Sequence, residues 1–257
     1  MTWLRRPRDE AAAAMDLADA AAARGDHDAA LALWGPLAQA GNARAQAEVG
    51  ACFAAGRGVA RDPALALKWL TLAAEAGDPA GRRHLAHAHF RGDGVPENPA
   101  RAAGLYRQAA DAGDAEAQDM LSWMLLEGQV IPPDTLEARR LAEAAAARGN
   151  AASMTRLGMI HHNALGVPRD PAAAARWWAM GAARGDADAQ AMLGAALLIG
   201  AGLPRDPFAG FVWLLRAQAG GSPLAYPFLR PAEDALPLED AARARRAADA
   251  PLPEPAR

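Results

Sequence analysis

Cysteine is almost missing from this sequence of 257 residues, which contains Cys52 alone. A single cysteine excludes an internal disulfide and a metal cage built from several thiolates. An excess of one charge is also missing, because the net charge is −3 and acidic and basic residues are interspersed. Without a basic block, the sequence predicts no binding of nucleic acid and no attraction to an anionic membrane.

A long apolar run is the third absence. The alanine-rich stretch 11–25 comes nearest to one, but Asp16 and Asp19 interrupt it. It therefore matches neither a secretory signal peptide nor a membrane-spanning helix. From these absences we expect a cytoplasmic protein that does not insert into membranes.

What the sequence does contain is a repeat. Glycines recur every 36 residues along most of the chain, at Gly41, Gly77, Gly113, Gly149, Gly185 and Gly221. A fixed period of about 20 to 50 residues is typical of a repeat array, in which each repeat contacts only its neighbours. We therefore predict an all-α fold, a right-handed α-solenoid of antiparallel helix pairs.

Each repeat is predicted to hold two helices joined by a loop. The first helices are expected to begin near Ala43, Pro79, Ala115, Ala151 and Ala187. A Gly-x-Gly loop follows in most repeats, where glycine permits the positive φ that ends a helix. Each second helix begins after a capping side chain, which a proline follows in all repeats but the third. The capping residues are Asp62, Asn98, Asp134, Asp170 and Asp206.

Small and large residues stand side by side in both helices. The first helices carry a column of tiny residues, which are Gly50, Ala86, Ser122, Gly158 and Gly194. The second helices carry a bulky column of Trp69, Leu105, Leu141, Trp177 and Trp213. This pattern predicts closely packed helices with the bulky column in the core. Trp178 is expected to pack on the next repeat; the alternative is a binding patch on the convex face.

The ends of the chain depart from the repeat. We expect residues 1–40 to form an N-terminal capping pair of helices, with a kink or an early helix end at Pro36. Residues 41–221 then make up five repeats. Residues 222–250 are expected to hold a half-repeat, disturbed by Pro227 and Pro231, and a capping helix. The proline-rich tail 251–257 is expected to be disordered.

The repeat resembles that of the Sel1-like family, which is related to the tetratricopeptide repeats. The last full repeat carries the matching residues Ala187, Ala189, Gln190, Leu193, Gly194, Gly200, Gly202, Asp206 and Trp213. Gln46 and Gln118 also match the glutamine column, whereas Arg82 and Met154 depart from it. The third repeat lacks the second glycine, the proline and the tryptophan. This resemblance implies a superhelix of helix pairs and work as an adaptor or scaffold.

Aromatic and methionine side chains mark a candidate binding groove on the concave face, which the first helices line. Anchors of this kind dominate the energy of protein interfaces. The candidates are His87, Phe90, Met120, Trp123, Leu126, Met159, His162 and Met192. The alternative is that these columns pack between successive repeats.

The histidines permit a second interpretation. His84 and His87 lie one helical turn apart, so both could bind one metal ion, with Glu48 and Asp119 near them. His89 and His161 stand where the family has a buried tyrosine, so they are expected in the core. Because no clear third ligand follows at helical spacing, we predict no metal and no cofactor.

Catalytic motifs are missing as well. The Gly-x-Gly loops follow helices instead of strands, and the sequence has neither H-E-x-x-H nor G-x-S-x-G. We therefore predict a non-enzymatic, monomeric scaffold that binds a protein or peptide. One alternative is a ligand-binding relative linked to β-lactams, although such relatives carry paired cysteines. The other is an envelope factor associated with peptidoglycan, which requires export.

Overall fold

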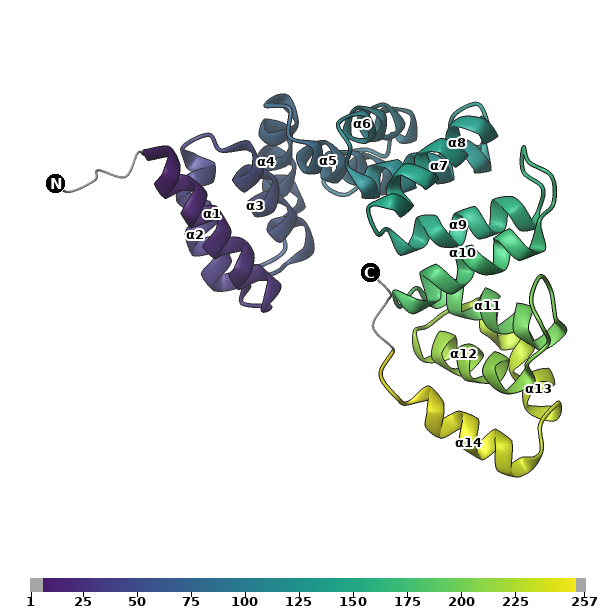
Figure 1. The fold of residues 1–257 in the computed structure, drawn as a ribbon. Coiled ribbons are helices and arrows are strands. Elements are labelled where there is room, and N and C mark those ends of the chain that lie inside the picture. Colours follow the sequence, from purple (N-terminus) through teal and green to yellow (C-terminus); the bar gives the residue numbers. More distant parts are fainter. Residues whose placement is uncertain (1–6, 253–257) are drawn as a thin grey trace. The chain divides into compact units, whose positions relative to one another are not determined.

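The computed structural model describes residues 7–252 (Figure 1). These residues form fourteen α-helices and one short 3-10 helix, with no strand among them, which confirms the all-α prediction. The chain divides into two compact units. Unit 1 comprises Met1–Met124 with Gln129–Ile131, and unit 2 comprises Leu125–Gly128 with Pro132–Arg257. The division falls inside the third repeat, the one that departs most from the pattern.

The five repeats hold helices of nearly equal length. The first helices are α3 (Ala43–Ala55), α5 (Pro79–Arg91), α7 (Ala115–Glu127), α9 (Ala151–His162) and α11 (Ala187–Ile199). The second helices are α4 (Pro63–Glu75), α6 (Pro99–Asp111), α8 (Thr135–Ala147), α10 (Pro171–Ala183) and α12 (Pro207–Ala219). All five first helices begin at the predicted residue.

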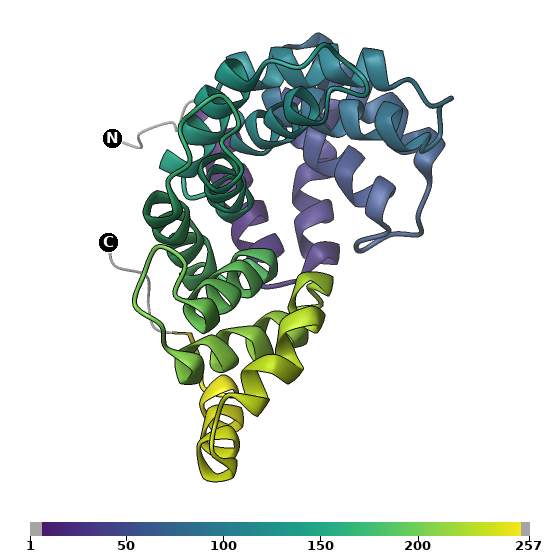
Figure 2. The same cartoon turned by 90° about the vertical axis from the view of Figure 1, so that its right-hand side faces the viewer.

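Neighbouring helices pack against one another throughout each unit (Figures 1 and 2). In unit 1 the pairs α3–α4 and α5–α6 form repeats, and α4 also packs on α5. In unit 2 the pairs α9–α10 and α11–α12 do the same, with α10 on α11. A stack of this kind, in which each pair covers the next, is the predicted solenoid of 36-residue repeats.

The predicted capping residues begin all five second helices. Each side chain accepts a hydrogen bond from the backbone N–H three residues further on, at 2.9–3.0 Å. Proline follows the cap in every repeat but the third, where Thr135 stands at that position. The cap satisfies one of the N–H groups that a helix start leaves without an intrahelical partner.

The tiny column of the first helices is where the second helices come closest. A Cβ added at Gly50 would lie 2.7 Å from the Leu70 side chain, and one at Gly158 would lie 2.2 Å from Trp178 Nε1. At Gly194 the same atom would lie 2.8 Å from the Leu214 side chain. These glycines therefore make room for the large side chains of the second helices.

Trp178 is only 2% exposed, so the convex-patch alternative for this residue is wrong. Its core cluster includes Ala189 and Leu193 of the next repeat, as predicted.

The prediction that the bulky column lies in the core is wrong for four of its five members. Only Leu141 is buried, whereas Trp69, Leu105, Trp177 and Trp213 are half-buried. The core position is the next one along the helix, which holds Leu70, Tyr106, Ala142, Trp178 and Leu214, because this is the side chain that faces the tiny column of the first helix.

The second glycine of each Gly-x-Gly loop lies against the start of the preceding second helix. A Cβ at Gly94 would lie 2.6 Å from the carbonyl oxygen of Pro63, at the start of α4. At Gly202 it would lie 2.1 Å from the carbonyl oxygen of Pro171, at the start of α10. These loops therefore pack on the preceding repeat. Glycine is needed there because a side chain would collide with that repeat, and because the backbone φ is positive.

Two helices precede the repeats, α1 (Pro7–Ala23) and α2 (His27–Gln39), and they pack on each other in unit 1. Helix α2 continues through Pro36 to Gln39, so the predicted early end does not occur. After the repeats come η1 (Pro223–Ala225), α13 (Tyr226–Asp234) and α14 (Leu238–Ala248). The tail predicted to be disordered comprises residues 251–257, and its last five residues, 253–257, lie outside the described residues.

Replacing Gly158 by alanine should destabilise the protein by about 1–3 kcal/mol, because the new methyl group would collide with the Trp178 ring. Gly104→Ala is the matched control. It is an exposed helical glycine with no atom near the added Cβ, so this change should stabilise by about 0.5–1 kcal/mol. Urea unfolding followed by circular dichroism measures both; a Gly158→Ala protein as stable as the wild type would contradict this packing.

Candidate functional site

The eight predicted groove residues fall into the two units. His87, Phe90, Met120 and Trp123 belong to unit 1, where α5 and α7 carry them. The other four belong to unit 2 and are Leu126, Met159, His162 and Met192.

In unit 1 the structure brings two aromatic candidates together. The rings of Phe90 and Trp123 meet edge to face, with centroids 5.8 Å apart and planes at 86°. This geometry places the positive edge of one ring on the negative face of the other. Both side chains are half-buried, as is Met120, and His87 is exposed one helical turn before Phe90. The two rings therefore support each other, and both residues remain partly accessible to solvent.

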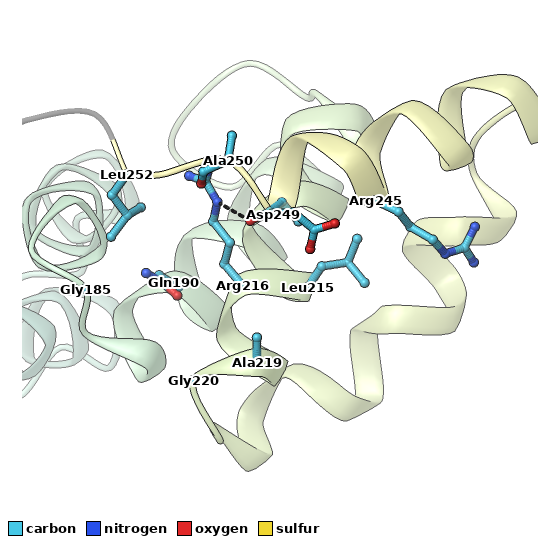
Figure 3. Close-up of a pocket in the computed structure, with 11 residues that line it drawn as sticks. Gly185, Gln190, Leu215, Arg216, Ala219, Gly220, Arg245, Asp249, Ala250 and Leu252 are labelled. Atoms are coloured by element: carbon cyan, nitrogen blue, oxygen red, sulfur yellow. Dashed lines mark hydrogen bonds between the residues drawn. The ribbon is translucent and has the colours of Figure 1, made fainter.

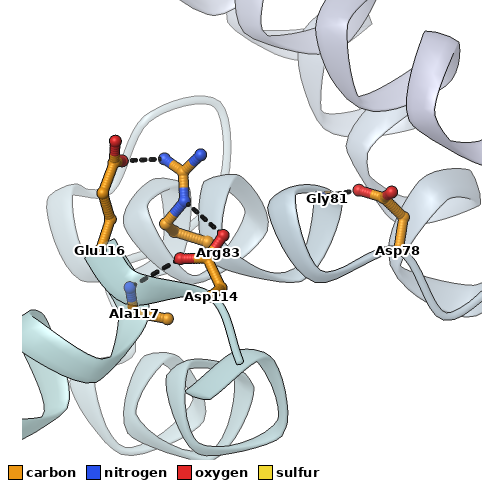
Figure 4. A network of polar contacts seen from close by, with 6 residues as sticks. All are labelled: Asp78, Gly81, Arg83, Asp114, Glu116 and Ala117. Carbon is orange, nitrogen blue, oxygen red and sulfur yellow. Dashed lines mark hydrogen bonds and ion pairs between the residues drawn. The ribbon is translucent and has the colours of Figure 1, made fainter. Parts of the chain in front are cut away.

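A polar link between repeats holds the helices that carry this pair (Figure 4). Arg83 of α5 donates from Nε to Asp114 Oδ2 at 3.1 Å, and its Nη1 lies 2.5 Å from Glu116 Oε2. Asp114 also caps α7, since its Oδ1 accepts from the Ala117 N–H at 2.7 Å. Arg83 and Asp114 are largely buried, which makes this link worth more than a surface ion pair.

The equivalent link recurs in unit 2. Thr155 stands 72 residues after Arg83, at the same position of the repeat. Its hydroxyl donates to Asp186 Oδ1, the cap of α11, at 2.7 Å. Sequence reasoning missed these ties. The signal was present, because the column holds polar residues in the three inner repeats (Arg83, Asp119 and Thr155) and alanine in the first and last.

The buried glutamine column ties repeats together as well. Gln118 donates from Nε2 to the carbonyl oxygen of Ala110 at the end of the preceding second helix, at 3.1 Å. Arg82, which departs from the column, donates from Nε to the equivalent carbonyl of Ala74 at 3.4 Å. The substitution keeps the N–H donor, so the link survives the change of residue type.

In unit 2 the candidates lie at the edge of the core. Leu126 packs against the cluster of Leu157 and Ile160, while Met159 and Met192 pack against the cluster of Trp178 and Leu193. The ring of His162 lies 5.4 Å from that of Trp178, at an interplanar angle of 50°. All four candidates are half-buried. These contacts are those of the alternative interpretation, in which the columns pack between repeats.

The histidines of α5 stand in different environments. Burial, together with the nearby Arg83, Arg57 and His87, lowers the pKa of His84 to about 3. His89 is 7% exposed and burial lowers its pKa too, as expected for a residue in the core. Over residues 7–252, no three His, Cys, Asp or Glu side chains come close enough together to hold a metal ion.

Cys52 is 2% exposed, and burial raises the pKa of its thiol. A buried, protonated thiol is a poor nucleophile. Glu48, one turn away, is half-buried; burial and the neighbouring Asp19 raise its pKa, against the opposing effect of Arg44. The described helices include none that is long and apolar enough to cross a membrane.

The architecture is that of an α-helical repeat protein, in which successive helix pairs pack on one another. The Sel1 repeat model matches five consecutive segments, which are residues 43–78, 79–114, 115–150, 151–186 and 187–222. The chain therefore belongs to the Sel1 repeat family. Proteins built from these repeats typically serve as scaffolds for protein interactions.

Solved structures show the same fold. A Sel1 repeat protein from Oxalobacter formigenes is 25% identical over 96% of this chain and 99% of its own, with a TM-score of 0.77. One from Klebsiella pneumoniae subsp. pneumoniae is 19% identical over 77% and 97%, with a TM-score of 0.53. An immunity protein from Pseudomonas aeruginosa is 18% identical over 81% and 83%, with a TM-score of 0.50. No curated protein matches the sequence.

The low pKa of His84 makes stability depend on pH. The ordinary pKa of histidine, about 6.5, applies in the unfolded chain, whereas burial lowers the pKa of His84 to about 3 in the fold. Between these values the unfolded state binds a proton that the folded state does not, so the free energy of unfolding falls as pH drops. We expect a loss of about 2 kcal/mol from this residue between about pH 7 and pH 4.5.

His84→Gln isolates that contribution, because other groups titrate equally in both proteins. Urea unfolding at both pH values should show a smaller acid loss in the variant. An equal loss of stability in the two proteins would mean that the pKa of His84 is not lowered in the folded protein.

Proposed function

We propose that the protein is a non-enzymatic scaffold that binds a segment of a partner protein on the first-helix face of unit 1. The observation that carries this proposal is the edge-to-face contact of Phe90 and Trp123, two half-buried aromatic side chains. Aromatic side chains that are already ordered lose little conformational entropy on binding, and they are enriched among the residues that dominate interface energy. His87 and Met120 stand beside the pair and complete the contact surface.

Rigid support favours binding at this place. The Arg83–Asp114–Glu116 link ties α5 to α7, and the Gln118 hydrogen bond ties α7 to α6. A surface held in this way presents its anchors in one arrangement, which suits an extended peptide or a helix laid across several repeats. Leu126, Met159, His162 and Met192 of unit 2 pack against core residues, so they are not part of the surface proposed here.

The remaining assignments follow from the same proposal. The pair α1–α2 caps the N-terminal end of the repeats, and the segment 222–250 caps the other end. The protein works as a monomer in the cytoplasm, and it needs neither metal nor cofactor for binding.

Site-specific photocrosslinking tests the location of the partner. A photoreactive amino acid in place of exposed His87 should capture a partner in the native cell, whereas the same residue in place of exposed Lys68, on α4, should not. Equal capture from both positions would contradict binding on the first-helix face.

The captured partner then allows an affinity measurement. Trp123→Ala should weaken its binding by about 2 kcal/mol, roughly 30-fold, because it removes the larger anchor. Leu72→Ala is the matched control, since Leu72 is an apolar side chain of unit 1 that is 47% exposed on α4. Circular dichroism confirms that both variants fold. Unchanged affinity of the Trp123 variant would place the site elsewhere.

A further inference from the structure

One side of α5 carries basic and aromatic side chains. An α-helix turns by about 100° per residue, so positions 83, 84, 87, 90 and 91 lie within an arc of about 120°. These positions hold Arg83, His84, His87, Phe90 and Arg91, which together form the basic face of α5. Helix α5 contains no aspartate or glutamate that could offset their charge. The helix face that presents the Phe90 ring is therefore basic.

Only one of these basic residues has carboxylate partners. Asp114 and Glu116 of α7 hold the guanidinium of Arg83. His87 and Arg91 are exposed, and within residues 7–252 neither side chain forms an ion pair or a hydrogen bond. The same is true of Arg57, which lies in the loop after α3 and is exposed as well. These three side chains are available to a ligand.

His84 lies among these basic residues and responds to them. Its pKa falls to about 3, mainly through burial, and the positive charges of Arg83, Arg57 and His87 lower it further. No carboxylate is among the groups of the described chain that shift this pKa. Because Arg57 acts on His84, the loop after α3 lies beside the basic face of α5, and α3 itself packs on α5. The surface at this place is positive and lacks an anion.

The carboxylates nearest to the free arginines do not neutralise them. In the sequence the closest one to Arg91 is Asp93, which pairs with Arg61 at 2.9 Å. Glu48 of α3 is the carboxylate that feels Arg57, but burial raises the pKa of Glu48 and makes its charge costly. It therefore competes weakly for the guanidinium. Two arginine charges remain without a counter-ion beside the aromatic pair.

An arginine of unit 2 shows how this protein satisfies such a side chain internally. Helix α14 packs on α12, and Arg216 of α12 reaches the end of α14 (Figure 3). It donates to the carbonyl oxygens of Ala247 at 3.1 Å, Ala248 at 3.3 Å and Ala250 at 3.0 Å. The last carbonyls of a helix lack intrahelical partners, so this contact satisfies both sides. Arg57 and Arg91 make no such contact with the described chain.

We propose that the partner segment bound on the first-helix face of unit 1 is acidic. Its Asp or Glu carboxylates bind Arg57 and Arg91, and a neighbouring apolar side chain packs on Phe90 and Trp123. His87, one turn from both Phe90 and Arg91, supplies an N–H donor to the same segment. This inference rests on the function proposed above and adds the charge of the partner segment to it.

The number and setting of the charges favour an acidic protein segment. Hydrogen bonds between a guanidinium and a carboxylate are short, charge-assisted and often bidentate, so two arginines suffice to select one or two acidic side chains. Exposed charges at the edge of an interface also speed encounter with an oppositely charged partner. A nucleic acid requires many phosphate contacts. The carboxylates of Asp114 and Glu116 on the neighbouring helix would repel such a polyanion.

Peptide selection tests the proposal without a known partner. Random peptides of about 12 residues are displayed on phage and selected on the immobilised full-length chain, and those that also bind the Trp123→Ala chain are discarded. The remaining peptides should be enriched in Asp or Glu within one helical turn of Leu, Phe or Trp. Their synthetic, fluorescently labelled forms then give dissociation constants by anisotropy, after circular dichroism has shown that each variant folds.

Charge reversal separates the two arginines from other cations. Arg57→Glu and Arg91→Glu should each weaken the selected acidic peptide by about tenfold or more. Lys68→Glu is the matched control, since Lys68 is an exposed cation on α4 of the same unit, and it should change little. A peptide with lysine in place of its acidic residues should bind the Arg91→Glu chain more tightly than the wild type. Raising the salt concentration from about 0.05 M to about 0.5 M should weaken the acidic peptide on the wild-type chain.

The outcomes distinguish the charge of the segment from the site itself. Selected peptides that need Trp123 but show no acidic excess would overturn the charge proposal and leave the site in place. If every selected peptide bound the Trp123→Ala chain equally well, the site would fall and the inference with it. A labelled single-stranded DNA that binds the wild-type chain, loses binding in Arg57→Glu and Arg91→Glu, and displaces the peptides would assign these arginines to nucleic acid.

Discussion

Close approach of paired helices at residues without a side chain is the constraint on which this fold depends. Gly158 lies directly against the indole of Trp178, and Gly50 and Gly194 receive leucines in the same way. Because the small residue is on one helix and the large one on the other, neither can change alone without a gap or a collision. The third repeat illustrates this balance, since Ser122 and Ala142 stand at the two positions.

Polar ties between repeats act on top of this packing. The glutamine column reaches back to the preceding second helix, and the Arg83 and Thr155 column reaches forward to the cap of the next first helix. Each tie joins a side chain to a backbone carbonyl or to a capping carboxylate. It therefore fixes the position of one helix relative to the next and also holds the two together. The aromatic pair of Phe90 and Trp123 is presented by helices held in this manner. The surface proposed for binding therefore depends on contacts between repeats.

The sequence alone predicted the parts of the structure that depend on local chemistry. The helix starts at Ala43 and Pro79 and the caps at Asp62 and Asp170 were predictable, because a capping side chain and proline act within one turn. Candidate site residues were harder. Whether Phe90 stays half exposed or Leu126 joins a core cluster depends on how neighbouring repeats rotate against each other, which periodicity does not specify. Likewise, nothing local in residues 238–248 indicates that α14 packs along α12.

Arg216 has a consequence for how the end of this chain can evolve. Its three hydrogen bonds go to main-chain carbonyls, which every amino acid provides. Mutations in the last helix therefore leave this contact intact as long as the segment stays helical and ends at the same place. The exposed positions of the terminal helix are accordingly free to drift in sequence, whereas Ala241 and Ala244, which are buried in the cluster with α12, must stay small.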